Sequence, residues 1–410
     1  MVSGGIEAVP GIRLAQEMGL HVVVSDGNPQ APGMAVAHDR LVASTYDSRA
    51  TAAAAREYHT TVRPIDGVMC IASDLRFTVA HVAETLGLPG ISTRSAQLAS
   101  DKMAMKLRFA SDGIPIPYFS EIICAADLRS IIRARGFPLV LKPVDSRGAR
   151  GVLRLTEEVD AEWAVGFSRS FSPSGRIMVE EYLDGPQVST ESLVIDGVAY
   201  TPGFSDRNYE LLERYHPHII ENGGELPSHL PVHIQQSVRE VVGRAAASMG
   251  IQNGVVKGDM VVSRGKPYVI ELAARLSGGY FCTHEIPLNT GVNFVGLAIR
   301  QALGEKPRPE ALTPTIQRGV AQRYLFPAPG RVNRISGIEE VRCRAEVALC
   351  DVRVRVGDIV GPINCHPHRA GVVIAVGDSR DNAVARVLDA ISRIKIETEQ
   401  SSGRASRPAA

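Results

Sequence analysis

The sequence predicts a protein of the α/β and α+β classes that begins with a parallel sheet. Three observations support this prediction. The first hundred residues alternate between apolar runs and helical patterns, as β-α-β units do. From 138 to about 204 the chain consists of short strand patterns separated by turn residues. After about 319, a small α+β pattern ends in a helical pattern over 381–394.

Length and composition limit the number of domains and the kinds of partner. A chain of 410 residues is too long for one compact core, so we expect domains at 1–100, 101–318 and 319–396. The second has a smaller subdomain at about 115–183, and residues 397–410 have the composition of a disordered tail. A net charge of +1 and the lack of a long apolar run argue against nucleic-acid and membrane partners.

The start of the chain and its cysteines favour a cytoplasmic protein. The first residues do not have the pattern of a signal peptide. The six cysteines include no C-x-x-C pair, and a chain of this size needs no disulfide framework. Two His-Pro-His triplets, at 216–218 and 366–368, have no Cys, Asp or Glu at ligand spacing, so we expect no zinc site.

The N-terminal pattern predicts a helix over 6–18, a buried strand over 20–26 and a second strand over 66–71, followed by a helix to about Leu86. Ser3-Gly4-Gly5 has the composition of a loop after a first strand, yet only two residues precede it. Either that strand is missing from this chain, or the domain begins with an irregular edge.

The central region predicts helices and one clear hairpin. A helix begins at Asp101 and ends at Gly113, and Ile114-Pro115-Ile116-Pro117 forms a linker. Asp196-Gly197 between apolar runs predicts a hairpin. Further helices are expected over 232–249 and 293–303.

A second predicted hairpin, over 254–272, carries the most informative pair of residues. If its turn centres on Gly265, Asp259 and Glu271 lie six residues to either side and oppose each other on one face. Opposed carboxylates repel, so a proton or a cation must lie between them, and Mg²⁺ with its preference for oxygen ligands fits. The alternative is a register shift that turns both acids to water, which the apolar flanking strands disfavour.

Three further segments carry candidate residues. Arg275, followed by paired glycines, is well placed to reach phosphate oxygens near a metal site. Lys142 lies on an apolar strand, before a loop over 144–151 that could cover phosphates or simply form a flexible hairpin with a salt-bridged lysine. Glu180, at the end of a strand, could accept a hydrogen bond from an adenine amino group, although exposed acids at strand ends are common.

In this order the segments resemble the ATP-grasp superfamily, in which two α+β subdomains close on ATP. The resemblance spans about Gly4 to Ile394 and implies an ATP-grasp fold with an N-terminal parallel-sheet domain and a small C-terminal α+β domain. It rests on D-K-x-x-x-K at 101–106, V-L-K-P at 140–143, the glycine loop, V-E-E-Y-L-D-G at 179–185 and E-L-A-A-R-L-S-G-G at 271–279.

The resemblance implies roles for individual residues. Those implied to bind ATP are Lys102, Lys142, Ser146, Gly148, Gly151, Glu180, Glu181, Leu183 and Gln187. Asp259 and Glu271 are implied to bind Mg²⁺, with Mn²⁺ as an alternative ion, while Arg275 and Lys142 are implied to act on the transferred phosphoryl group. Three departures from the common pattern are Ala273 in place of Asn, Gln187 in place of a ribose-binding acid, and Asp259 in place of Glu.

The reaction that the resemblance implies joins a small-molecule carboxylate, activated as an acyl phosphate, to an amine. The segment 204–228 resembles the acceptor side of carboxylate–amine ligases such as L-amino-acid ligases, and the resemblance also allows a homodimer. One alternative is carboxylation as in biotin carboxylase, disfavoured because no E-R-D-C-S-x-Q-R-R stretch occurs. Another alternative is a nucleotide-binding regulator without turnover.

Overall fold

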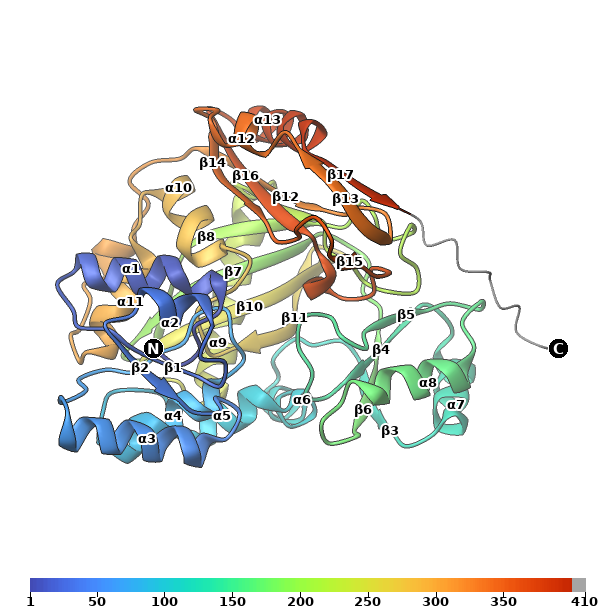
Figure 1. The fold of residues 1–410 in the computed structure, drawn as a ribbon. Helices are drawn as coiled ribbons and strands as arrows, with labels where there is room; N and C mark the ends of the chain where they lie inside the picture. The colour runs from blue at the N-terminus through green and yellow to red at the C-terminus, as the bar shows by residue number, and fades with distance from the viewer. Residues whose placement is uncertain (400–410) are drawn as a thin grey trace.

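The structure is a computed structural model that describes residues 1–399. Figure 1 shows an N-terminal domain in blue, a small lobe in cyan to green, and a main body whose last strands, in orange and red, lie above the others. Within the described residues, no helix is both long and apolar enough to cross a membrane.

The N-terminal domain has a parallel pair of strands, β1 (Val23–Asp26) and β2 (Asp39–Val42), which confirms the predicted parallel pairing. Its helices are η1 (Ile6–Ala8), α1 (Val9–Glu17), α2 (Pro32–Val36), α3 (Ser48–Thr61), α4 (Arg76–Leu86) and α5 (Thr93–Ser100). The predicted strand over 66–71 is wrong as a regular strand. Its neighbour, the segment 1–3, reaches it through only one backbone hydrogen bond, from Val2 N to Met69 O at 2.8 Å, so no ladder forms.

The small lobe is a four-stranded antiparallel sheet with two helices, connected to the N-terminal domain by α6 (Lys102–Ser111). The Asp101 side chain caps α6 by accepting a hydrogen bond from the amide of Ala104 at 2.9 Å. The sheet has the order β3-β6-β4-β5. The elements of the lobe are β3 (Phe119–Ile122), α7 (Ala125–Arg135), β4 (Leu139–Pro143), β5 (Leu153–Leu155), α8 (Ala161–Ser170) and β6 (Ile177–Glu181).

The main body is built on an eight-stranded sheet of order β11-β10-β7-β8-β9-β12-β16-β14. Its strands are β7 (Gln187–Ile195), β8 (Val198–Asn208), β9 (Gly223–Leu226), β10 (Gly254–Ser263), β11 (Lys266–Ala273), β12 (Gly319–Leu325), β14 (Val347–Val352) and β16 (Gly371–Gly377). The helices of this region are α9 (Val232–Ser248), η2 (Phe281–Glu285), α10 (Ile286–Thr290), α11 (Phe294–Ala302) and η3 (Pro309–Leu312).

Both predicted hairpins are confirmed, and their turns explain their sequences. Asp196 and Gly197 have φ of 48° and 80°, and Arg264 and Gly265 have φ of 51° and 75°. Two successive residues with positive φ are characteristic of the two-residue turns that match the twist of antiparallel strands. Glycine at the second position adopts a positive φ without the steric clash that a Cβ atom would cause there.

Three of the C-terminal strands, β12, β14 and β16, extend the main sheet, and the junction is the pairing of β12 with β9 along Val320–Arg323. A second, smaller sheet has the order β15-β13-β17. The remaining elements are β13 (Gly330–Ser336), α12 (Ile338–Arg342), β15 (Ile359–Val360), η4 (His366–His368), α13 (Arg380–Arg393) and β17 (Lys395–Glu399). The predicted tail is therefore wrong for 397–399, since Glu399 pairs with Arg331 of β13, and the rest of that tail, 400–410, lies outside the described residues.

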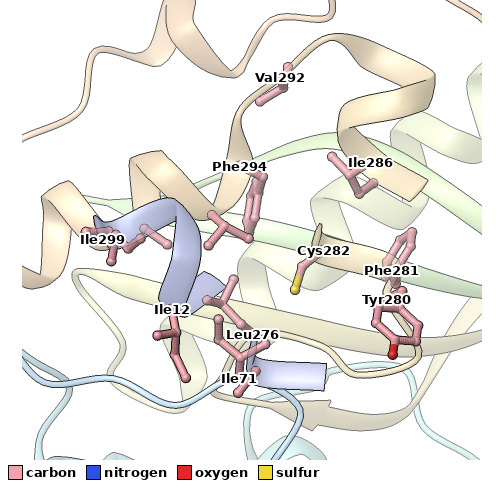
Figure 2. Packing of buried hydrophobic residues seen from close by; sticks show 14 of the residues in the cluster. Ile12, Ile71, Leu276, Tyr280, Phe281, Cys282, Ile286, Val292, Phe294 and Ile299 are labelled. Atoms are coloured by element: carbon pink, nitrogen blue, oxygen red, sulfur yellow. The ribbon is translucent and has the colours of Figure 1, made fainter. Parts of the chain in front are cut away.

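The largest hydrophobic cluster joins the N-terminal domain to the main body. Figure 2 shows Ile12 of α1 close to Ile71 and Leu276, with Phe294 and Ile299 of α11 on the other side of the same cluster. The backbone supports this junction, because the amide of Ala72 donates a hydrogen bond to Leu276 O at 3.2 Å. The loop that carries Arg275 is therefore held by the core on its C-terminal side.

Candidate functional site

A cleft of about 600 Å³ lies between the small lobe and the main sheet. Most of the residues that the sequence predicts for the site line it. These are Lys102, Lys142, Ser146, Gly148, Glu180, Glu181, Leu183, Gln187, Asp259, Glu271 and Arg275. Gly151 is not among the lining residues. Its φ of 73° and the 2.8 Å that would separate an added Cβ from Pro143 Cγ show why a glycine is needed there for packing.

Asp259 and Glu271 are direct partners in the pairing of β10 with β11, as predicted. A β-bulge produces this register. Met260 pairs with Val269, so continuous pairing would set Asp259 opposite Ile270, and one extra residue in β11 brings Glu271 opposite instead. Such bulges are common next to active sites, where they redirect a side chain. Both acids consequently line the same cleft.

Basic side chains flank both acids, in addition to the proton or metal ion that the sequence predicts between them. Asp259 forms ion pairs with Lys257 and with Arg207, the latter at 2.9 Å. Burial alone would raise the pKa of Asp259, but these cations outweigh it and hold the pKa well below its usual range. Glu271 lies 3.5 Å from Lys102 and 3.9 Å from Arg76.

Glu180 is buried between two lysines rather than free to face a ligand. Its carboxylate lies 2.5 Å from Lys142 Nζ and 3.1 Å from Lys106 Nζ, and all three side chains are almost fully buried. The two ammonium groups outweigh the effect of burial and lower the pKa of Glu180, while burial lowers the pKa of Lys106 to about 8. Lys106 was not predicted as a site residue, although its position four residues after Lys102 puts both on one face of α6.

Arg275 is held in place from two sides. Its Nε donates to Asp74 Oδ1 at 2.9 Å, and its Nη1 donates to the carbonyl of Leu276 at 3.1 Å. Asp74 also accepts a hydrogen bond from Arg76 at 2.7 Å, so one carboxylate orients two guanidinium groups, of which that of Arg275 lines the cleft. No local pattern in the sequence points to Asp74, because it comes from the N-terminal domain 201 residues before Arg275.

Part of the cleft lining comes from the C-terminal region, in and beside η4 and β12, and was missed by sequence reasoning. His366 N donates to Gly148 O at 3.0 Å, which connects one predicted His-Pro-His triplet to the glycine loop. Arg369 lies over the ring of Tyr324 at 3.8 Å and approaches Glu221 at 3.7 Å. Its Nε and Nη2 atoms are buried without a hydrogen-bond partner in the described residues, as is Nε of Arg207. Buried guanidinium groups of this kind suit an anionic ligand.

The donor atoms in the cleft fit Mg²⁺ bound together with a phosphate ligand. Asp259 and Glu271 offer only oxygen atoms, which is the preference of this ion. Among residues 1–399 no group of three or more His, Cys, Asp or Glu side chains is arranged to hold a metal. The two acids would therefore share the ion with oxygen atoms of the substrate and of water. The six cysteines are free in the structure.

Three family models match the chain: an ATP-grasp N-terminal domain at 12–90, an ATP-grasp domain at 99–279 and an L-amino acid ligase C-terminal domain 2 at 323–399. An uncharacterised protein of Sinorhizobium fredii is 24% identical over 93% of this chain and 79% of its own length. A formate-dependent phosphoribosylglycinamide formyltransferase of Shewanella amazonensis is 25% identical over 93% of this chain and 92% of its own.

Solved structures show the same fold at lower identity. The L-amino acid ligase from Bacillus licheniformis superposes with a TM-score of 0.82 at 23% identity, covering 97% of this chain and 98% of that one. A biotin carboxylase domain from Hydrogenobacter thermophilus, in complex with MgADP, has a TM-score of 0.74 at 19% identity, with 97% and 90% of the two chains covered. At these identities the likeness establishes the fold and leaves the reaction to be argued from the site.

Proposed function

Since this chain belongs to the ATP-grasp superfamily, we propose that it is an ATP- and Mg²⁺-dependent ligase that joins a carboxylate to an amine and releases ADP and phosphate. The observation that carries the proposal is the register of β10 and β11, which sets Asp259 opposite Glu271 in the cleft that Lys102, Lys142 and Arg275 also line. Two acids and three cations around one cavity suit a triphosphate bound with a divalent ion.

Different residues are proposed to bind the phosphates, the transferred phosphoryl group and the metal ion. Lys102 and Lys142 offset negative charge on the phosphates, and Arg275, held by Asp74, stabilises the transferred group as charge redistributes. Mg²⁺, when bound to Asp259 and Glu271, supplies further positive charge to the phosphate oxygens. The carboxylate substrate takes the γ-phosphoryl group as an acyl phosphate, and the amine then displaces phosphate.

The loop over 144–151 protects this intermediate from water. Lys102 Nζ donates to the carbonyl of Ser146 at 2.8 Å, and His366 N donates to that of Gly148, so the loop is held on both sides of the cleft. A covered site matters because water would hydrolyse an acyl phosphate before the amine arrives.

Two findings favour an amine as the acceptor. The match of 323–399 to an L-amino acid ligase domain covers the C-terminal residues that line the cleft, including Arg369. The E-R-D-C-S-x-Q-R-R stretch expected of a biotin-carboxylase-like enzyme is absent from the sequence. We further propose that the substrates are small molecules and that the protein forms a homodimer. A cytoplasmic location is proposed because the six cysteines are free.

A matrix of carboxylates and amines tests the proposal. Purified protein with MgATP is assayed for release of ADP and phosphate against each acid–amine pair, and against bicarbonate with biotin. We expect release only when an acid and an amine are both present. Release that depends on bicarbonate and biotin, or tight ATP binding without release in any pair, contradicts the ligase assignment.

A further inference from the structure

The cleft contains one buried carboxylate that the steps above do not use. Eight acidic residues line the cleft. Those with an ion-pair partner are Glu7, Asp74, Glu180, Glu221, Asp259 and Glu271. Glu181 is exposed to solvent. The eighth, Glu285, is only 2% exposed, and within residues 1–399 no lysine, arginine or histidine forms an ion pair with it.

The surroundings of Glu285 leave its carboxylate open toward the cleft. Among the described residues its one hydrogen bond comes from Ser205 Oγ at 3.1 Å, and Ser205 lines the cleft as well. Gly224 lies against the pair: a Cβ there would be 2.4 Å from Ser205 Oγ and 3.4 Å from Glu285 Oε2. Glu191 is another buried acid, but it does not line the cleft, and its carboxylate accepts a hydrogen bond from the backbone amide of Ser277.

The register of the main sheet connects this position to the metal-binding acids. Glu271 pairs with Asp259, Asp259 with Ser189, and Ser189 with Ser205, so one row of residues crosses β11, β10, β7 and β8. Directly opposed residues project from the same face of a sheet. Ser205 lies two strands beyond Asp259, which is about 10 Å at the usual strand spacing. Ser205 ends this row, so its hydrogen-bond partner Glu285 lies beside that end and away from the two acids proposed to bind Mg²⁺.

We propose that Glu285 and Ser205 form the subsite that binds the positively charged amino group of the amine substrate. A buried carboxylate without a counter-ion is unfavourable, and an ammonium group supplies both the missing charge and hydrogen-bond donors. Burial raises the pKa of Glu285 to about 8, so a cation that binds beside it stabilises the ionised form. The inference rests on the proposed ligase function for the identity of the ligand as a substrate.

Direct binding tests the subsite without depending on turnover. The protein, loaded with Mg²⁺ and a non-hydrolysable ATP analogue, is titrated calorimetrically with each of the common L-amino acids and with their N-acetyl derivatives. We expect Glu285→Gln to weaken the binding of the free amino acid by about 30-fold or more, because a buried charge pair is lost. Affinity for the nucleotide should stay within about twofold, since Glu285 is not placed at the phosphates. Glu162→Gln, on the surface of α8, is the matched control.

Ser205→Ala provides a second variant if Glu285→Gln does not fold. It keeps the carboxyl group and removes its hydrogen-bond donor, so we expect amine binding to weaken by about threefold to tenfold. Equal affinity for free amino acids in wild type and Glu285→Gln, or no binding of any free amino acid by the wild type, overturns the subsite. A higher KM for the carboxylate substrate alone also overturns it. If the wild type releases no ADP with any acid–amine pair, the result contradicts the proposed ligase function and not the subsite.

Discussion

Glu271→Gln is expected to lower kcat/KM for ADP release by about 10²- to 10³-fold. The change removes one of two opposed carboxylates, so the remaining Asp259 binds the ion with one neutral amide in place of an anion. The side chain keeps its size, and the neighbouring Lys102 and Arg76 retain an oxygen acceptor. Steady-state rates at several Mg²⁺ concentrations measure the effect, and we expect the Mg²⁺ requirement to rise together with the fall in rate.

The matched control for this variant is Glu162→Gln, which makes the same chemical change at a side chain that is 67% exposed. It should leave kcat/KM unchanged. A melting temperature close to that of the wild type shows that Glu271→Gln acts on the site and not on folding. Wild-type kcat/KM in a folded Glu271→Gln protein would contradict the metal assignment.

Glu180→Leu is expected to reduce the free energy of unfolding by about 3–5 kcal/mol, because it leaves two buried ammonium groups without a counter-ion. Lys106 and Lys142 both depend on this carboxylate, and all three side chains are buried between the small lobe and α6. Chemical denaturation followed by circular dichroism measures the change.

A triple variant separates charge from packing. Lys106→Met combined with Glu180→Leu and Lys142→Met replaces the charged cluster with apolar side chains of similar volume. Buried ion clusters replaced in this way commonly lose little stability, so we expect most of the loss in Glu180→Leu to be recovered. Equal instability of the single and triple variants would show that packing, and not unpaired charge, accounts for the loss. The triple variant should be inactive, since Lys142 is gone.

Local patterns in the sequence predicted much of the fold and of the site. The helices over 102–111 and 232–248 and the two hairpins follow from caps, apolar periodicity and turn residues near in sequence. The pairing of Asp259 with Glu271 was also predicted, but from an assumed turn centred on Gly265. The real turn is Arg264-Gly265, and the bulge in β11 restores the expected pair. Sequence patterns of this kind do not reveal a bulge.

Contacts between distant segments account for what the sequence did not show. Asp74, which orients Arg275, and Arg369, which lines the same cleft, come from distant parts of the chain. Local periodicity says nothing about such pairs, because they depend on the docking of the domains. The predicted strand over 66–71 failed for a related reason, since a strand needs a neighbour that pairs along its length.

Isotope transfer from the carboxylate to phosphate tests the central claim most directly. The acid of an active acid–amine pair is labelled with ¹⁸O in its carboxylate, and the phosphate released with ADP is analysed by mass spectrometry. Activation as an acyl phosphate predicts that each phosphate carries one labelled oxygen, because the carboxylate oxygen leaves with phosphorus when the amine attacks. Unlabelled phosphate, or release of AMP and pyrophosphate in place of ADP, would contradict the account.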